Sequence, residues 1–340
     1  MSRVARIWQA MQWRRRRQIR IARAFRKRRE LSLLVDRTDA IRRGDILVFA
    51  TLRNEAQRLP YFMEHYRALG VRHFLIVDND STDNSCNYLC AQPDVSLWHT
   101  NASYRKSRFG MDWMQALLMR YGNGHWCVTV DIDELLIYPH HDTRPLPALT
   151  EWLDAEGEVS FVAPMLDLYP KGPLDAVGYA PSQNPTEVLN WYDAANYSIQ
   201  RKPYIDALWI QGGPRSRSFF TDNPQQGPTL TKVPLVKWHW RYLYLNSTHS
   251  LLPAHLNHTY DSEGGEKLSG VLLHTKFLPE ITDKSREEKQ RRQHFGAPEA
   301  FDAYYDALID APDLWTPYSS PYRGWRQLEA DGLMSRGGWG

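Results

Sequence analysis

The sequence predicts an α/β fold in which helices cover both faces of a mostly parallel sheet. The first observation behind this prediction is a set of short apolar runs typical of buried strands, at residues 46–52, 72–78, 95–99 and 125–131. The second is a set of segments with helical periodicity between those runs, at residues 59–69, 81–90 and 111–121. Alternation of this kind is typical of parallel sheets, whose ligands bind beyond the carboxyl ends of the strands.

Three regions follow from changes in composition along the chain. Residues 1–44 are expected to form a basic N-terminal arm or helix, residues 45–280 the main α/β domain, and residues 281–340 a helical C-terminal extension with a tail. A strand is predicted over 159–168, whereas 170–228 are rich in Pro, Gly and Asn with weak periodicity and are expected to form a long, functional loop region.

Charge is distributed unevenly along the 340 residues. Residues 1–30 carry twelve Arg or Lys and one acid, so the remaining chain carries −8 of the overall net charge of +3. A basic helix with Trp8, Met11 and Phe25 on one side suits an anionic membrane surface, each nearby cation adding about 1 kcal/mol. A solvated arm and a nucleic-acid contact are the alternatives. No RNA-binding module follows, so no nucleic-acid partner is expected.

Three cysteines in a chain of this length argue against a disulfide framework. The sequence has no apolar run of eighteen residues and no apolar segment typical of a secretory signal. We therefore expect a cytoplasmic protein, with residues 1–30 offering peripheral attachment to the inner face of the membrane.

Polar residues stand where three of the predicted strands end. Asp131 and Asp133 follow the fourth strand at spacing i, i+2, which would direct both carboxylates to one side of an extended chain. Two carboxylates so close repel each other unless a cation lies between them, and Mn²⁺ or Mg²⁺ prefers such oxygen ligands. The pair therefore predicts a metal site. The alternative is that the two aspartates only stabilise a turn or cap a helix.

Other residues are expected to complete a nucleotide site at the same sheet edge. Arg53, Asn54 and Glu55 follow the first strand, and Asp78 ends the second. Arg53 would approach a diphosphate, while Asp78 would accept hydrogen bonds from a base or a ribose. Arg215 and Arg217 flank Ser216, and in an extended chain both would face a diphosphate, for which guanidinium groups are well suited.

The order of these motifs resembles family 2 glycosyltransferases. The segments that carry the resemblance are Ala50–Ala56, Leu59-Pro60, His65–Val71, Asp78–Asp83, Trp113, Asp131–Leu135, Gly213–Arg217, Leu230–Leu235 and Leu272–Leu278. The resemblance is greatest to the subgroup with an Asp-x-Asp-Glu signature, and it covers about residues 45–280.

The resemblance implies a GT-A fold and transfer of a sugar from a nucleotide-sugar donor, a UDP-sugar foremost, to a glycan or lipid-linked acceptor, with inversion. It implies that Asn54, Glu55 and Asp78 contact the nucleoside and that His274 adds a third metal ligand to Asp131 and Asp133. In this chain Thr275 follows His274, where the family pattern often has Phe.

Inverting transfer needs a carboxylate that takes the proton of the acceptor hydroxyl. Asp167, at the end of a predicted strand, is the first candidate, and Asp206 is a further one. Glu134 adjoins the metal pair, but strand alternation would turn it away unless the chain bends.

Two other functions are compatible with the motifs. The first is a membrane-surface scaffold with a degenerate GT-A domain, against which the two intact aspartates argue. The second is a nucleotidyltransferase, which would be expected to show a Gly-rich loop directly after the first strand. That position holds Arg53–Ala56, which has no glycine.

Overall fold

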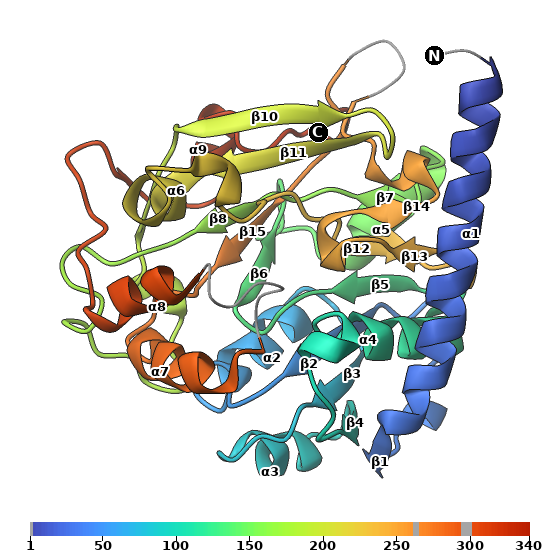
Figure 1. Cartoon of the computed structure of the whole chain (residues 1–340), viewed down its shortest axis with the longest axis horizontal. Coiled ribbons are helices and arrows are strands. Elements are labelled where there is room, and N and C mark those ends of the chain that lie inside the picture. The colour runs from blue at the N-terminus through green and yellow to red at the C-terminus, as the bar shows by residue number, and fades with distance from the viewer. Residues whose placement is uncertain (1–2, 261–264, 294–300) are drawn as a thin grey trace.

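The computed structural model describes residues 3–260, 265–293 and 301–340. Within these residues the chain forms a mixed α/β fold with a larger central sheet, a smaller second sheet, and helices packed around both (Figure 1). The predicted α/β class is therefore confirmed, and the arrangement is that expected of a GT-A fold.

The central sheet contains seven strands among the described residues, in the order β1-β4-β3-β2-β5-β12-β7. These are β1 (Ser32–Val35), β2 (Leu47–Leu52), β3 (His73–Asp78), β4 (Val95–His99), β5 (Trp126–Thr129), β7 (Ser160–Phe161) and β12 (Leu235–Lys237). The adjacent strands β4, β3, β2 and β5 are parallel, whereas β1 and β12 pair antiparallel with their neighbours. The carboxyl ends of the four parallel strands consequently meet at one edge.

Both faces of this sheet are covered because its strands are apolar on both sides. Val48 and Ala50 point to the core under α2 (Leu59–Ala68), α3 (Ser85–Cys90) and α5 (Leu146–Ala155). Leu47 and Phe49 point to the opposite core, under α4 (Met111–Leu117). The alternation follows from the two-residue period of a strand.

A second sheet brings three polar residues into line. Its order is β6-β15-β8, formed by β6 (Glu134–Ile137), β15 (Val271–His274) and β8 (Met165–Asp167). His274 is opposite Glu134 on one side and opposite Asp167 on the other. The core beneath this sheet also contains residues of α7 (Ile281–Arg291), α8 (Asp302–Ile309) and α9 (Trp325–Ala330).

Two predictions about the middle of the chain are wrong in detail. Residues 159–168 form β7 and β8, which belong to different sheets, because Ala163 and Pro164 lead the chain from one sheet to the other and proline has no N–H for a ladder. The region 170–228 contains β9 (Trp191–Tyr192), the hairpin of β10 (Tyr197–Lys202) and β11 (Ala207–Gly212), and α6 (Gly213–Phe219). The remaining short strands are β13 (Leu243–Tyr244), β14 (Leu251–Leu252) and β16 (Ser320–Pro321).

The basic N-terminal segment is helical as predicted, and it is packed on the fold rather than free. α1 (Arg3–Lys27) lies against α4 along one edge of the molecule (Figure 1). Arg23 forms an ion pair of 2.6 Å with the buried carboxylate of Asp112, and the Trp113 indole N–H donates to Glu30 at 2.9 Å. Among the described residues, no helix has the length and apolar character needed to cross a membrane.

Candidate functional site

The Asp131-Ile132-Asp133 segment forms a turn that connects β5 of the central sheet with β6 of the second sheet. The backbone N–H of Glu134 donates to the carbonyl of Asp131 at 3.1 Å, which closes the turn. The expectation of an extended chain here is therefore wrong. Because the chain bends, Glu134 faces the same cavity as the two aspartates, whereas alternation in a straight strand would turn it away.

This turn lines a cavity of about 520 Å³ at the carboxyl edge of the parallel strands. The cavity gathers seven of the predicted site residues, namely Arg53, Glu55, Asp131, Asp133, Glu134, Arg215 and His274. Further charged residues on its wall are Arg58, Lys232, Lys276, Lys284, Glu287, Glu288 and Arg291. Cations and carboxylates thus alternate around one space.

Lys232 binds two of the acids. Its buried ammonium lies 2.8 Å from Glu134 and 3.3 Å from Asp131. The side chain of Asp131 is 53% exposed, whereas that of Glu134 is buried. Burial raises the pKa of Glu134 to about 7; the Lys232 charge opposes this change, and the charges of Asp131 and Asp133 add to it.

A second chain of contacts runs through His274. Its Nε2 lies 3.1 Å from Asp133 and its Nδ1 lies 2.6 Å from Asp167, which in turn accepts a 2.7 Å hydrogen bond from Arg215. Burial disfavours the charged form of His274, but the two carboxylates outweigh burial and raise its pKa. Burial likewise opposes ionisation of Asp133, yet the charge and hydrogen bond of His274 hold the pKa of that carboxyl well below its usual range.

Lys276, a possible phosphate partner from its place in the sequence, lies on the cavity wall, and Arg58 and Lys284 add positive charge there that was not predicted. Arg58 is buried between Glu55 at 3.1 Å and Glu280 at 3.2 Å, and Lys284 of α7 contacts Glu55 at 2.5 Å. The i, i+3 spacing of Glu55 and Arg58 was the available signal for this pair. The contact between Lys284 and Glu55 depends on the packing of α7 against the turn after β2, which local sequence does not indicate.

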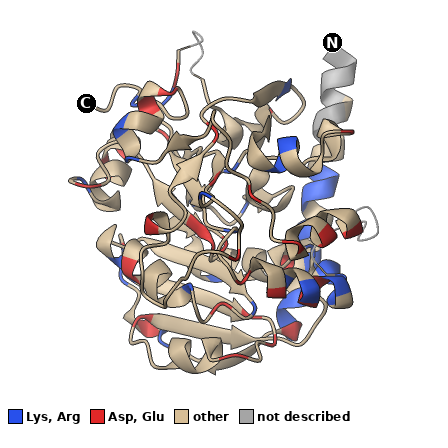
Figure 2. Ribbon diagram, turned by 90° about the vertical axis from the view of Figure 1, so that its left-hand side faces the viewer, with Lys and Arg blue, Asp and Glu red and all other residues tan. Residues whose placement is uncertain are grey.

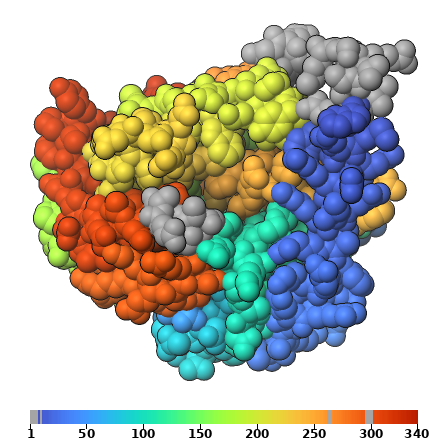
Figure 3. All heavy atoms as spheres, in the orientation of Figure 1, coloured from blue at the N-terminus to red at the C-terminus, as the bar shows by residue number. Residues whose placement is uncertain are grey.

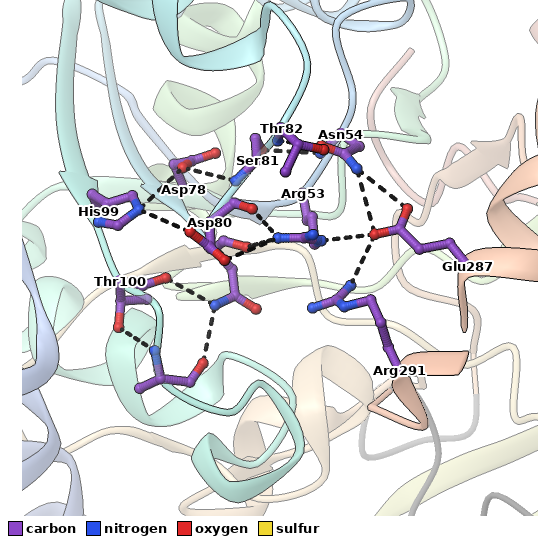
Figure 4. A network of polar contacts seen from close by, with 12 residues as sticks. Arg53, Asn54, Asp78, Asp80, Ser81, Thr82, His99, Thr100, Glu287 and Arg291 are labelled. Atoms are coloured by element: carbon purple, nitrogen blue, oxygen red, sulfur yellow. Dashed lines mark hydrogen bonds and ion pairs between the residues drawn. The ribbon is translucent and has the colours of Figure 1, made fainter. Parts of the chain in front are cut away.

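α7 also covers the turn after β2 (Figure 4). Glu287 accepts hydrogen bonds from Arg53 at 2.9 Å and from the Asn54 amide at 3.2 Å. Asn54 adopts a positive φ of 53° and lines an adjoining cavity of about 190 Å³. In Figure 4, Asp78 lies above Asp80, and one of its oxygens accepts a hydrogen bond from the Ser81 N–H at 3.2 Å. Asp78 is buried and is not on the wall of either cavity.

Besides Asn54 and Asp78, three predicted residues are placed away from the larger cavity. Residues 213–219 form α6 rather than an extended chain, so Arg215 and Arg217 point to different sides of a helix. Arg217 binds Asp193 at 2.8 Å, and Asp167 is buried behind His274. Asp206 contacts His258 and Arg201 at the end of the β10–β11 hairpin.

The residues of the cavity were tested for a metal site. In the described part of the chain, no three His, Cys, Asp or Glu residues are close enough to hold an ion together. Asp133 and His274 do present an oxygen and a nitrogen 3.1 Å apart at the cavity, while Asp131 is bound to Lys232. The carboxylate is a donor that Mn²⁺ and Mg²⁺ prefer, whereas imidazole is more typical of Zn²⁺, Cu, Fe and Ni sites. The pair therefore offers two donors to a divalent ion, and phosphate oxygens and water would have to supply the others.

No family model and no curated protein matches this chain. Among solved structures, it is similar to a mannosyltransferase from Pyrobaculum calidifontis in complex with GDP-Man and Mn²⁺, with 21% identity over 50% of this chain and 47% of that chain and a TM-score of 0.27. It is also similar to a putative glucose-1-phosphate thymidylyltransferase from Bacillus anthracis, with 8% identity over 75% of this chain and 98% of that chain and a TM-score of 0.35. The chain spans about half the length of the mannosyltransferase. These similarities are too distant to support a function, which must rest on the geometry of the site.

Proposed function

We propose that this protein is a glycosyltransferase that moves a sugar from a nucleotide-sugar donor to a glycan or lipid-linked acceptor, with Mn²⁺ or Mg²⁺ and with inversion. One observation carries the proposal. The turn of Asp131, Asp133 and Glu134 shares a cavity with His274 and with several buried cations, at the edge where parallel sheets bind ligands. A donor diphosphate needs this combination of a metal site and fixed positive charge.

The donor diphosphate is assigned to the centre of the cavity. Asp133 and His274 would hold the metal ion, with Asp131 bonding to it directly or through water. The ion would neutralise the negative charge that develops on the departing nucleoside diphosphate. Arg215, whose Nη2 is buried without a partner among the described residues, offers an unused donor to a phosphate oxygen.

The nucleoside is assigned to the region of Arg53, Asn54 and Glu55. Asp78 binds Ser81, whose hydroxyl accepts a hydrogen bond from the Asn54 N–H. Arg53 and Asn54 both bind Glu287 of α7, so a nucleoside would exchange contacts with that glutamate. A UDP-sugar remains the first donor to test.

We assign acceptor activation to Glu134 and a positioning role to Asp167. Glu134 faces the cavity, and its pKa of about 7 lets it take a proton from a hydroxyl at neutral pH. The acceptor oxygen would then bond to the anomeric carbon while the bond from that carbon to the diphosphate breaks. Asp167 faces away from the cavity and bonds to Nδ1 of His274, which fixes the orientation of the imidazole.

Ligand-induced stabilisation tests the proposal without knowledge of the acceptor. UDP-, GDP- and CMP-sugars are added to the full chain with and without Mn²⁺, and the melting temperature is recorded. A donor at 100 times its Kd stabilises the fold by about 2.7 kcal/mol, which raises Tm by a few degrees. We expect one nucleotide class to do so only with metal. No shift with any sugar nucleotide contradicts the proposal.

The product distinguishes this function from its alternative. A glycosyltransferase releases a nucleoside diphosphate from the donor, whereas a nucleotidyltransferase forms a sugar nucleotide from a nucleoside triphosphate and a sugar phosphate, with release of pyrophosphate. The sharp turn at Arg53–Glu55, without the glycines of a phosphate-binding loop, favours the first reaction.

A further inference from the structure

The outward face of α1 combines positive charge with exposed apolar side chains. Residues that share this face at spacings of three and four are Trp8, Met11, Arg15, Ile19, Ala22 and Arg26, and the face continues to Arg29 in the 3-10 turn Arg28–Glu30; all of them are exposed. Trp8 and Met11 are each 65% exposed, Ile19 is 57% exposed, and Phe25 beside them is 52% exposed. The face extends for about 30 Å at 1.5 Å per residue.

The arginines of this face are not paired with acidic residues of the described chain. Arg15, Arg26 and Arg29 form no ion pair with any residue that the structure describes. Figure 2 shows Lys and Arg gathered along the described part of α1, whereas residues 31–340 together carry a net charge of −8. The positive charge is therefore concentrated on one edge of an otherwise acidic molecule.

The opposite face of α1 is fixed to the domain, which holds the outward face in place. Ala24 is fully buried, Arg23 pairs with Asp112, and the carbonyl of Lys106 accepts a hydrogen bond from Arg23. Arg20 donates to the carbonyl of Leu245. In Figure 3 the helix forms one edge of the molecular surface.

We propose that the outward face of α1 docks on the surface of an anionic lipid bilayer. Arginine side chains reach lipid phosphates, while the exposed Trp, Met, Ile and Phe side chains enter the boundary between headgroups and acyl chains. Binding to nucleic acid would use the arginines but would leave the apolar side chains in water. The acidic remainder of the chain is repelled by the same surface, so only this edge adheres.

Docking in this way would also fix the distance of one wall of the cavity from the bilayer, because α1 lies between them. α1 binds the carbonyls of Lys106 and Leu245, and the neighbouring residues Tyr104 and Asn246 line the cavity. The docking itself does not depend on which group the cavity transfers.

Vesicle flotation of the full chain tests the docking. The helix is not deleted, because its inner face is part of the core. Instead, Arg15, Arg26 and Arg29 are replaced by Gln in one variant, and Met11 and Ile19 by Ser in a second. The matched control replaces Arg43, Arg72 and Arg323 by Gln; these are exposed on other parts of the surface, and the charge change is the same.

Vesicles of phosphatidylcholine with 30% phosphatidylglycerol, about the anionic fraction that gives a strong surface potential, are compared with pure phosphatidylcholine. We expect the wild type and the control to float only with the anionic vesicles. Both α1 variants should lose about tenfold or more in partition coefficient, with unchanged melting temperatures. The proposal is overturned if the α1 variants float as the control does, or if the wild type binds RNA but not the anionic vesicles. Neither result depends on donor turnover, so a failed docking leaves the proposed transfer reaction standing.

Discussion

His274 connects the carboxylate of Asp133 at the cavity with the buried carboxylate of Asp167. It bonds to Asp133 at the cavity and to Asp167 behind it, and Asp167 is held by Arg215. Neutral imidazole binds a metal through one nitrogen while its other N–H is oriented by a hydrogen bond. In the proposed mechanism this arrangement gives Asp167 a positioning role, which its place at a strand end did not indicate.

Replacement of Asp167 by Asn tests this positioning role. We expect the Mn²⁺ concentration that gives half-maximal donor turnover to rise by about 10- to 100-fold, since the imidazole loses the carboxylate that orients it. Glu134→Gln should instead leave the Mn²⁺ requirement unchanged and lower kcat by about 100-fold or more. A metal titration of donor turnover distinguishes these outcomes.

Asp193→Asn is the matched control for that experiment. Asp193 is likewise buried and bound to an arginine, Arg217, but it lies away from the cavity. Its replacement should affect stability without changing the metal requirement. If Asp167→Asn and Asp193→Asn have the same metal requirement as the wild type, Asp167 does not position His274.

The sequence predicted the site residues whose position follows from their place after a strand. It did not predict contacts that depend on which distant strands pair and in what register. Asp131 and Asp133 follow from their place after a buried strand. The contact between His274 and Asp167 requires the pairing of β15 with β8, strands more than one hundred residues apart in the sequence. Arg215 and Arg217 were expected to face the same side because an extended chain was assumed. Both lie in α6, which directs their side chains to different sides.

At the scale of elements, β15 is the strand that positions His274, and Gly270 determines how closely it approaches its neighbours. A Cβ atom at Gly270 would lie 2.5 Å from the carbonyl oxygen of Ile137 and 2.9 Å from the ring of Phe161. The first neighbour is backbone and cannot move without shifting β6. Only glycine allows this close approach.

Gly270→Ala is therefore expected to lower the free energy of unfolding by about 1–3 kcal/mol, the usual cost of overpacking a core. Urea denaturation gives this value. Gly178→Ala is the control, since nothing lies within 4 Å of the added Cβ, and it should change stability by less than about 0.5 kcal/mol. Equal stabilities of the two variants would contradict the claim that only glycine fits at position 270.

The strands of the central sheet and the helices that cover it could be predicted because each has a strong local pattern. Buried parallel strands such as β3 are continuous apolar runs, and α2 has a clear 3.6-residue period ending at Gly70. The division of 159–168 between two sheets could not be predicted, because both pieces are apolar and only their distant partners differ. The hairpin of β10 and β11 lacked apolar alternation, since β10 is largely exposed.

For the molecule as a whole, buried histidines predict a loss of stability in mild acid. Burial lowers the pKa of His65 to about 4 and that of His249 to about 3, from an ordinary value of 6.5. Below pH 6.5 the unfolded chain binds protons that the folded chain does not, so folding becomes less favourable until about pH 4 for His65. His274 has the opposite sign because its pKa is raised.

Urea unfolding at pH 7.5 and pH 5.5 measures this effect. Stability should fall on the order of 1 kcal/mol per pH unit for each such histidine below pH 6.5. His65→Gln keeps a donor for the carbonyl of Leu136 and should reduce the loss. A wild type that is equally stable at both pH values would contradict this interpretation.

The central claim is that Asp133 and its cavity transfer a sugar from a nucleotide donor with the help of a divalent ion. The most direct measurement is the release of nucleoside diphosphate from a panel of nucleotide sugars by the wild type and by Asp133→Asn, with Mn²⁺ and with EDTA. We predict metal-dependent release by the wild type and a loss of at least about 100-fold in the variant, in line with the removal of one group that stabilises developing charge. Absence of turnover in the wild type, or equal turnover by the two proteins, would contradict the claim.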